Sequence, residues 1–413
     1  MKKQIVVLGG GTGGVIAANR LRRMDPDLSI TVVEPSPVHT YQPGLLFVPF
    51  GKKMVDEFQR PLAQQLRSGV QLLQAEVSSV DITGQTVTTT TGKTIEYDIL
   101  IVATGASLLT EETEGLLGSG WGRDVFTFYD AKGSSGLAGA MDALSSGRLV
   151  INIIDMPIKC PVAPLEFAFL SDAFFTERHV RDRIEIVYAT PLDSAFTKPV
   201  AAARLGKLLE QRGISIVPSF NTGEVDETEK RLISYDGREI GYDLLVTVPL
   251  HGGASYVGNS PGLGDEINFI PTDESTLQSR VASNVFVIGD AAGLSVSKAG
   301  SVAHFEGEVM TSNILAYLAG EPLPARFDGH ANCFIETGHR KALLIDFNTS
   351  VEPLPGHFPG PFGLPLLKES WLNHLGKLAF ETMYWHALLP GISLPLIGPE
   401  MPVRGKRMLA GTH

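Results

Sequence analysis

The stretch IVVLGGGTGGVIAANRL, residues 5–21, decides the fold, because it joins a short apolar run to a helical pattern through closely spaced glycines. Gly9, Gly11 and Gly14 have the spacing GxGxxG, which permits a tight turn and brings backbone N–H groups at a helix N-terminus close to a pyrophosphate. A second apolar run, SITVVE, ends at Glu34, 20 residues after Gly14, where a carboxylate can accept hydrogen bonds from a ribose. Strand, helix and acid together predict a dinucleotide-binding half.

The size and charge of the chain exclude several classes of protein. Its 413 residues suffice for two or three domains, and 43% of them are hydrophobic, which is typical of a globular protein. The net charge of -11 argues against nucleic acid as a partner. The opening MKKQIVVLGGG indicates a first β-strand rather than a signal peptide, and no apolar run reaches the roughly 18 residues that a membrane-spanning helix needs.

Two further apolar runs end in small residues and suggest which dinucleotide binds. They are YDILIVATGA, residues 97–106, and NVFVIGDAAG, residues 284–293. An acid at a strand end can bind the sugar-phosphate chain of an extended FAD. The predicted cofactor contacts at these two strand ends are Thr104, Gly105, Gly289 and Asp290.

A helix expected to start near Ala299 can direct its N-terminal dipole at the flavin ring. Lys298, just before it, has two interpretations: a cation that neutralises a reduced flavin, or a solvated turn lysine. These pieces together are similar to the FAD domain of the two-dinucleotide-binding flavoproteins of the disulfide-reductase type.

An internal repeat indicates a second, related half. GKTIEYDILIVATG, residues 92–105, is echoed by GREIGYDLLVTVPL, residues 237–250, and both patterns favour a hairpin that leads into a buried strand. The predicted fold class is therefore α/β, with two Rossmann-like domains and a C-terminal amphipathic helical segment. The expected divisions are an FAD-binding domain formed by 1–111 and 265–325, a second Rossmann-like domain at 112–264, and a C-terminal segment at 326–413.

The second half lacks the glycine motif that would hold a nicotinamide cofactor. After the strand RLVINII comes DMPIKCPVAPLE, residues 155–166, in which there is no glycine and three prolines remove backbone N–H donors. NAD(P)H therefore has no obvious site, and electrons must come from something small. Cys160 lies at the head of the next helix, where a thiol pKa is expected to be lowered. The chain has two cysteines, too few for a disulfide framework, so a role in chemistry is favoured over that of inert small hydrophobes.

Three motifs make a resemblance specific: KCPVAPLE around Cys160, NCFIETGHRKALLIDF around Cys333, and HLGKLAFETMYW, residues 374–385. Together they resemble the sulfide:quinone oxidoreductase family and its relative, the flavoprotein of flavocytochrome c sulfide dehydrogenase, over essentially the whole chain. The resemblance implies that the two cysteines accept sulfur from sulfide as a disulfide, persulfide or polysulfide bridge. It further implies that Cys333 is the flavin-side sulfur, that Cys160 carries the growing sulfur chain, and that Glu166 handles protons.

One departure from that family concerns the flavin link. Many members carry a further cysteine in the segment that corresponds to VFTFYDAKGS, residues 125–134, and this chain has none there. We therefore expect FAD to bind non-covalently. No spacing of a metal site is visible, and His304 and His339 are interpreted as packing or surface residues.

The C-terminal segment has two parts with different patterns. Residues 348–367, NTSVEPLPGHFPGPFGLPLL, are rich in proline and predict an extended linker or loop. Residues 368–389, KESWLNHLGKLAFETMYWHALL, have apolar residues at helical spacing and predict an amphipathic helix. An apolar stretch and the basic residues Arg404, Lys406 and Arg407 follow, a combination suited to an anionic lipid surface.

The helix has two interpretations. It can dock on the flavin domains or on a second subunit, or it can contact a membrane. The resemblance favours contact with one leaflet of a membrane, and it implies that Phe380, Tyr384 and Lys377 bind quinone.

The preferred hypothesis is a peripheral-membrane flavoenzyme that oxidises sulfide to sulfane sulfur or polysulfide and reduces quinone. Two alternatives stay open: a soluble sulfide dehydrogenase flavoprotein that passes electrons to a cytochrome, and a non-catalytic FAD-bearing scaffold or redox sensor. A type II NADH dehydrogenase is disfavoured because the second glycine motif is missing. The sequence leaves the oligomeric state open, a homo-oligomer included.

Overall fold

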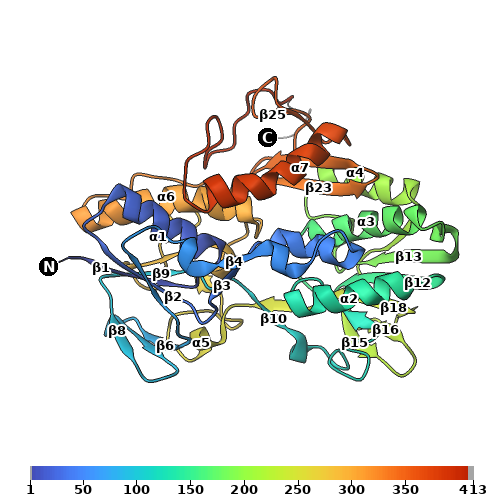
Figure 1. Cartoon of the computed structure of the whole chain (residues 1–413), viewed down its shortest axis with the longest axis horizontal. Helices are drawn as coiled ribbons and strands as arrows, with labels where there is room; N and C mark the ends of the chain where they lie inside the picture. Colours follow the sequence, from blue (N-terminus) through green and yellow to red (C-terminus); the bar gives the residue numbers. More distant parts are fainter. Residues whose placement is uncertain (1, 408–413) are drawn as a thin grey trace.

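The computed structural model describes residues 2–407 and contains two parallel sheets, one in each half of the molecule (Figure 1). The first sheet has the strand order β21-β9-β1-β2-β5, and every neighbouring pair is parallel. Its strands are β1 (Gln4–Leu8), β2 (Ser29–Val33), β5 (Val70–Leu73), β9 (Ile99–Val102) and β21 (Val285–Val287). Because β1 and its neighbours are buried on both faces, their sequences are almost continuously apolar.

Two helices cover one face of this sheet and pack against each other: α1 (Thr12–Met24) and α6 (Gly300–Ala319). Figure 1 shows them above the sheet, with the three-stranded sheet β6-β7-β8 below it. The strands of that smaller sheet are β6 (Val77–Asp81), β7 (Thr86–Thr89) and β8 (Thr94–Glu96). Since β8 leads directly into β9, the predicted hairpin feeding a buried strand is present.

The second sheet repeats this plan with the order β11-β18-β12-β13-β14, again all parallel. Its strands are β11 (Val125–Phe126), β12 (Gly147–Ile153), β13 (Ile184–Ala189), β14 (Ile214–Val217) and β18 (Leu244–Val248). Its helices are α2 (Ala131–Ala143), α3 (Ala163–Glu177) and α4 (Pro199–Gln211). A second three-stranded sheet comprises β15 (Thr222–Asp226), β16 (Arg231–Ser234) and β17 (Glu239–Gly241), so the internal repeat corresponds to a repeated architecture.

Short elements connect the two halves. The antiparallel pair β10 (Ser107–Leu109) and β19 (Leu250–Gly252) joins the segment that leaves the first half to the segment that returns from the second. Other short elements are β3 (Val38–Thr40), β4 (Gln59–Pro61), α5 (Ser255–Gly258), β20 (Ile270–Pro271) and β22 (Ala292–Gly293), and short 3-10 helices such as that at Gln42–Phe50.

The C-terminal segment lies across both halves, orange to red at the top of Figure 1. It consists of a four-stranded sheet of order β23-β24-β26-β25 and the helix α7 (Trp371–Met383), which continues as a π-turn over Tyr384–Leu388. The strands are β23 (Ala331–Gly338), β24 (Lys341–Phe347), β25 (Gly356–Phe358) and β26 (Leu364–Leu366).

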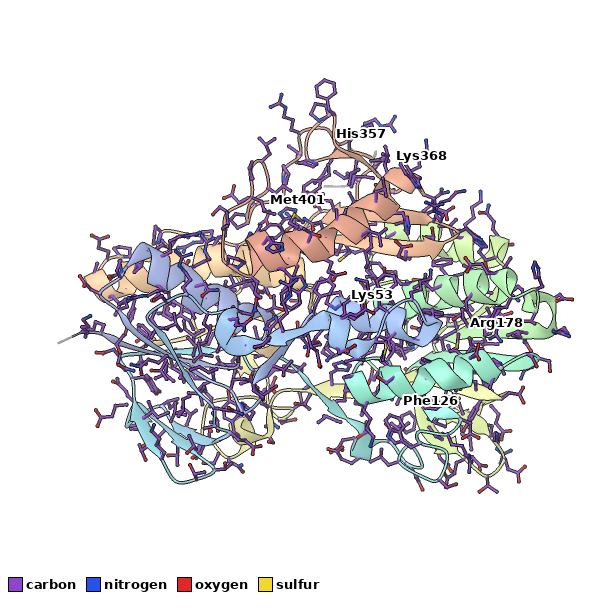
Figure 2. The ribbon with its side chains drawn as sticks, viewed as in Figure 1. Lys53, Phe126, Arg178, His357, Lys368 and Met401 are labelled. Atoms are coloured by element: carbon purple, nitrogen blue, oxygen red, sulfur yellow. The ribbon has the colours of Figure 1, made fainter. Side chains whose placement is uncertain are left out.

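The prediction of an extended linker at residues 348–367 is wrong in part, because β25 and β26 lie within it and join the sheet. Phe358 and Leu366 are buried and form a small apolar cluster with Leu344 of β24, so this proline-rich segment is packed against the sheet. Figure 2 shows His357 and Lys368 at its outer edge, away from the two halves.

Candidate functional site

The glycine motif forms the predicted turn between β1 and α1. Gly9 has a φ of +100°, which side-chain-bearing residues rarely adopt, and a Cβ on Gly14 would overlap the carbonyl oxygen of Gly9. Glu34, just after β2, accepts hydrogen bonds from the backbone N–H of Gly10 at 2.7 Å and of Ser36 at 2.9 Å. The acid thus braces the glycine turn as well as facing the cavity described below.

The ends of β9 and β21 lie next to the glycine turn, in the strand order β21-β9-β1, and line the same cavity. Gly105 and Gly289 have φ values of +70° and +72°, which let the chain turn sharply after each strand. Glu306 on α6 accepts a hydrogen bond from Gly289 N at 2.7 Å, and burial raises its pKa to about 7. Lys298 is buried and donates to the carbonyl oxygens of Asp290 at 2.9 Å and of Ala292 at 2.8 Å, so the alternative of a solvated turn lysine is wrong.

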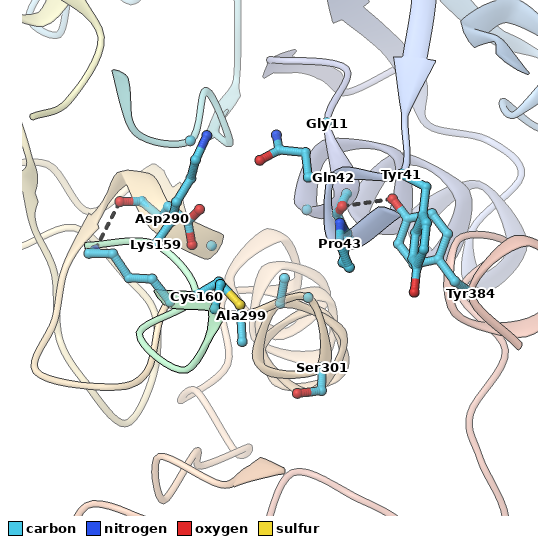
Figure 3. Close-up of a pocket in the computed structure, with 18 of the residues that line it drawn as sticks. Gly11, Tyr41, Gln42, Pro43, Lys159, Cys160, Asp290, Ala299, Ser301 and Tyr384 are labelled. Atoms are coloured by element: carbon cyan, nitrogen blue, oxygen red, sulfur yellow. Dashed lines mark hydrogen bonds between the residues drawn. The ribbon is translucent and has the colours of Figure 1, made fainter. Parts of the chain in front are cut away.

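A single cavity of about 330 Å³ collects almost all of the predicted site residues. It runs from the glycine turn past the start of α6 to both cysteines and to the inner face of α7 (Figure 3). Among the predicted residues, Gly14 alone does not line it, because its role is to let α1 approach β1. The predicted residues in the lining are Gly9, Gly11, Glu34, Thr104, Gly105, Cys160, Glu166, Gly289, Asp290, Lys298, Cys333, Lys377, Phe380 and Tyr384.

The two cysteines reach this cavity from different elements and are free thiols. Cys160 lies before α3 with a φ of +48°, and its backbone donates to Lys298 O at 2.6 Å and accepts from the Tyr129 hydroxyl at 3.1 Å. Cys333 lies on β23 and lines the same cavity as Cys160. The sequence did not specify how these partners fix the position of Cys160.

The expectation of a lowered thiol pKa at Cys160 is wrong. Burial raises the pKa of Cys160 to about 12, and this effect outweighs the opposing influences of Lys377 and of the hydrogen bond from Ala163 N. Burial also raises the pKa of Cys333. Helix α3 begins three residues after Cys160, at Ala163. In this pocket desolvation therefore prevails over any effect of the helix N-terminus.

Lys377 does not stand free at the quinone-side position that the resemblance implied. Its Nζ donates to Glu166 Oε1 at 2.8 Å and to Phe334 O at 3.2 Å, and both side chains of the ion pair are largely buried. Burial raises the pKa of the Glu166 carboxyl, while Lys377 and the N–H of Glu336 oppose the shift. Two residues assigned to different substrates thus form one polar unit beside the cysteines.

Tyr384 is tied to the glycine turn by its hydroxyl. His39 Nδ1 donates to Gly10 O at 2.9 Å, so Nε2 is the acceptor for the Tyr384 hydroxyl at 2.6 Å. Thr12 Oγ1 lies 2.8 Å from the same hydroxyl. Figure 3 shows Tyr41 and Tyr384 on the side of the cavity opposite Cys160 and Lys159.

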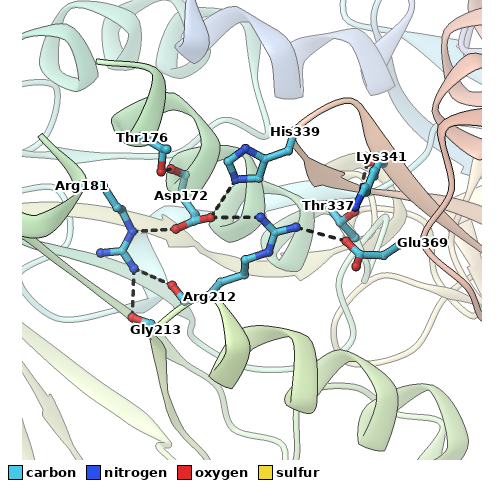
Figure 4. A network of polar contacts seen from close by, with 9 residues as sticks. All are labelled: Asp172, Thr176, Arg181, Arg212, Gly213, Thr337, His339, Lys341 and Glu369. Carbon is cyan, nitrogen blue, oxygen red and sulfur yellow. Dashed lines mark hydrogen bonds and ion pairs between the residues drawn. The ribbon is translucent and has the colours of Figure 1, made fainter. Parts of the chain in front are cut away.

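The hairpin that carries Cys333 is held against α3 and α4 by a polar network (Figure 4). Asp172 accepts from Arg181 Nε at 2.7 Å and lies 3.3 Å from Nε2 of His339, in the turn between β23 and β24. Arg212 lies 3.6 Å from Asp172 and 3.3 Å from Glu369, just before α7. His339 is an exposed residue of this turn, in line with the expectation of a packing or surface residue, and its contact with Asp172 helps to fix the turn.

Helix α7 turns its apolar stripe outward. Asn373, His374, Lys377 and Tyr384 face inward, whereas Trp371, Leu372, Leu375 and Leu378 are between 39% and 53% exposed. Such a contiguous apolar face is typical of a surface that contacts a partner or a lipid layer.

The basic tail contributes less to this face than predicted. The Lys406 side chain is buried and forms an ion pair with the buried Asp346, which also lies 2.8 Å from Nε2 of His330. Arg404 and Arg407 remain exposed.

Two properties of the described residues bear on the class of protein. Residues 2–407 contain no cluster of three or more metal-ligating side chains. No helix within that range is both long and apolar enough to cross a membrane.

A protein-family model and two relatives of known name match this chain. A family model described as pyridine nucleotide-disulphide oxidoreductase matches residues 3–135. The mitochondrial sulfide:quinone oxidoreductase of Mus musculus is 27% identical over 395 residues, which is 94% of this chain and 86% of that protein. The enzyme of the same name from Dictyostelium discoideum is also 27% identical, over 394 residues, with the same coverage of both chains. The resemblance to the sulfide:quinone oxidoreductase family is confirmed.

The fold agrees with that family. The crystal structure of sulfide:quinone oxidoreductase from Aquifex aeolicus superposes with a TM-score of 0.82 at 21% identity, covering 94% of this chain and 92% of that one. The family match implies a flavin-type dinucleotide cofactor, and the residues that could hold it are those of the cavity wall formed by the glycine turn, Glu34 and the ends of β9 and β21.

Sequence reasoning missed several residues of the site because their roles depend on contacts across the fold. Lys159 and Tyr129 line the cavity, and His39 and Glu306 brace its loops. Glu336 and His374 lie directly behind the Glu166–Lys377 pair. The position of Lys159 next to Cys160 was the one available sequence signal.

Proposed function

We propose that this chain is an FAD-dependent sulfide:quinone oxidoreductase, which oxidises sulfide to sulfane sulfur or polysulfide and reduces membrane quinone. One observation carries the proposal: a single cavity joins the dinucleotide loops, both cysteines of the chain and the inner face of α7. This arrangement brings a sulfur acceptor, a redox cofactor and an apolar surface together without a nicotinamide site.

The second half supports sulfide rather than NADH as the electron donor. The segment between β12 and α3, residues 154–162, contains no glycine and leads Cys160 to the cavity. A dinucleotide pyrophosphate needs free N–H groups in a tight turn, which the three prolines of residues 155–166 do not offer.

The cofactor loops fit FAD, which we propose binds non-covalently. We assign Glu34 to the ribose, the glycine turn to the pyrophosphate and the N-terminus of α6 to the ring, and the support for this is that all three line one cavity. Residues 125–134 contain no cysteine, and both cysteines of the chain are assigned to sulfur chemistry. Acid precipitation should release yellow flavin into the supernatant, whereas flavin in the pellet would contradict the proposal.

In this proposal the two cysteines bind the sulfur taken from sulfide, and a neighbouring group accepts the protons of their thiols. The bound FAD would supply two-electron chemistry, so that sulfide gives up two electrons and quinone takes two electrons and two protons. Because burial raises the pKa of both thiols, each must lose its proton to a neighbour before it reacts. We assign this role to Glu166, because its carboxyl lines the same cavity as both thiols.

We assign the quinone to the end of the cavity bounded by α7. The aromatic rings of Phe380 and Tyr384 line this end. Lys377 also lines the cavity, and we propose that it acts on the quinone together with Glu166, to which it donates a hydrogen bond. The exposed apolar stripe of α7 is proposed to rest on one leaflet of a membrane, next to the quinone entrance. We propose three parts of the chain. Residues 1–111 with 265–325 hold the cofactor, residues 112–264 form the second Rossmann-like domain that carries Cys160, and residues 326–413 carry Cys333 and the contacts with quinone and membrane.

Anaerobic titration of the holoprotein tests the proposal. Sulfide should bleach the flavin and NADH should not, and added short-chain quinone should restore the yellow colour. A flavin that stays yellow with sulfide would favour the scaffold or sensor. Reoxidation by a cytochrome c-type acceptor but not by quinone would favour the soluble sulfide dehydrogenase.

A further inference from the structure

Two pairs of ionisable side chains lie between the cavity and the surface beside α7, and the backbone N–H of Glu336 links them. Lys377 and Glu166 form the inner pair, with Nζ and Oε1 2.8 Å apart. Behind them, Nδ1 of His374 lies 2.7 Å from Oε1 of Glu336, and the backbone N–H of Glu336 donates to Glu166 Oε1 at 2.8 Å. The four residues come from α3, β23 and α7 and meet where these elements pack together.

Burial decreases outward across these two pairs. The side chains of Glu166 and Glu336 are 1% and 2% exposed, that of Lys377 is 11% exposed and that of His374 is 17% exposed. The imidazole is thus the member that reaches solvent, and its Nε2 has no hydrogen bond to any other described residue. Packing alone does not require the buried Glu336 carboxylate beside His374. Two apolar side chains would fill the same space at a lower desolvation cost.

The groups around Glu336 favour a proton carrier. Burial raises the pKa of its carboxyl, with a smaller contribution from the charge of Glu166, while His374 and Lys377 act in the opposite direction. Those are the charged groups that face it from α3 and α7, and β24 places Ala342 opposite it. A carboxyl with a raised pKa keeps its proton at a higher pH than an exposed carboxyl does, and it can pass that proton on.

We propose that His374 and Glu336 form a proton inlet that delivers a proton from solvent to the Glu166–Lys377 pair and from there to the quinone. This inference rests on the proposed function. With HS⁻ as substrate the balance is HS⁻ + H⁺ + quinone → S⁰ + quinol. Sulfide loses two electrons and its one proton, and the second proton of the quinol comes from solvent. A bridging water or a rotation of the Glu336 carboxyl completes the step between Glu336 and the inner pair.

The inlet predicts a separation of the two half-reactions. Reduction of the flavin by sulfide needs no proton from solvent, whereas reduction of quinone does. His374→Gln and Glu336→Gln should therefore leave sulfide-driven bleaching within about twofold of wild type and slow reoxidation by a short-chain quinone about tenfold or more. The slowing should increase with pH, and added imidazole should restore much of the rate in His374→Ala. A purely structural histidine would show neither effect.

The matched control is His386→Gln, because His386 is an exposed histidine in the π-turn that follows the same helix. It should reoxidise at the wild-type rate at every pH. As a readout independent of turnover, infrared spectra of the resting holoprotein between pH 5 and 8 should show a protonated carboxyl band that Glu336→Gln removes.

The outcomes separate the inlet from the function. If sulfide fails to bleach even the wild-type flavin, the proposed function is wrong and the inlet with it. If bleaching is normal and His374→Gln and Glu336→Gln reoxidise normally at all pH values, the inlet is wrong and the function stands. Slow reoxidation in His374→Ala that imidazole leaves unchanged would also overturn the inlet. A Glu336→Gln protein that does not fold leaves the histidine variants to decide.

Discussion

Nζ of Lys377 lies 2.8 Å from Oε1 of Glu166, although the two residues are 211 positions apart in the chain. This contact joins the helix with the outward apolar stripe to the helix that follows Cys160. Burial acts to lower the pKa of Lys377, but the charges of Glu166 and Cys160 outweigh it and the pKa is raised. Lys377 therefore keeps its positive charge in the cavity that the cysteines, Phe380 and Tyr384 also line.

Removing the charge of Lys377 alone should strongly lower the free energy of unfolding. Lys377→Met leaves the Glu166 carboxyl buried without its partner, a change that typically costs about 3–5 kcal/mol. The double variant Lys377→Met, Glu166→Gln removes both charges and should recover most of the loss. Urea denaturation of the holoprotein measures both, and equal stability of the single and double variants would show that the pair is not a coupled unit.

The two cysteines should act as one unit in sulfide oxidation. Cys160→Ser and Cys333→Ser should each abolish bleaching by sulfide, because the sulfur is held by both side chains. FAD should remain bound in both, since neither cysteine belongs to the glycine turn or the strand ends. Dithionite serves as the control, because it reduces a bound flavin without the thiols. Most of the sulfide activity remaining in either single variant would place the chemistry elsewhere.

The sequence predicted those features that depend on local pattern. The glycine spacing, the acid after β2 and the hairpins before the buried strands all follow from residues close together in the chain. The Glu166–Lys377 pair and the contact of Tyr384 with Thr12 could not be predicted, because they join residues 211 and 372 positions apart.

The sequence also could not show which of two opposing effects on the pKa of a side chain prevails, nor which way a helix faces. The position of Cys160 before a helix suggested a lowered pKa, but the extent of its burial, which reverses the shift, depends on the whole cavity. Likewise the spacing of α7 predicted an amphipathic helix without showing that its apolar side faces outward.

Glu306 should make stability depend on pH. Burial raises its pKa from 4.5 to about 7. A carboxyl with a raised folded-state pKa contributes fully below pH 4.5, and this contribution is lost as the pH rises to about 7. Glu306→Gln keeps the hydrogen bond from Gly289 without the charge. Its free energy of unfolding relative to wild type should therefore rise by up to about 3 kcal/mol between pH 4.5 and pH 8.

Urea denaturation of the holoprotein at several pH values measures this difference. Glu321→Gln is the control, because Glu321 is exposed just after the same helix and should show no such trend. A difference between Glu306→Gln and wild type that does not change with pH would contradict the assigned shift.

The outward stripe of α7 provides the most direct test of membrane contact. Removing the whole segment from Lys368 onward is unsuitable, because the inner face of α7 supplies Lys377 and the buried Tyr384 to the cavity. Leu375→Glu with Leu378→Glu changes only side chains that are 39% and 52% exposed, so the fold and the flavin should be preserved.

Placing two carboxylates on this stripe should weaken flotation with liposomes, because charged side chains are costly to bury among acyl chains. Turnover of long-chain quinone in liposomes should fall with it, while bleaching by sulfide stays at the wild-type rate. Leu117→Glu is the matched control, since Leu117 is 51% exposed on a loop of the second half, away from α7. If the double variant floats with liposomes and turns over long-chain quinone as wild type does, the stripe is not the membrane contact, and docking of α7 on a soluble electron acceptor becomes the better explanation.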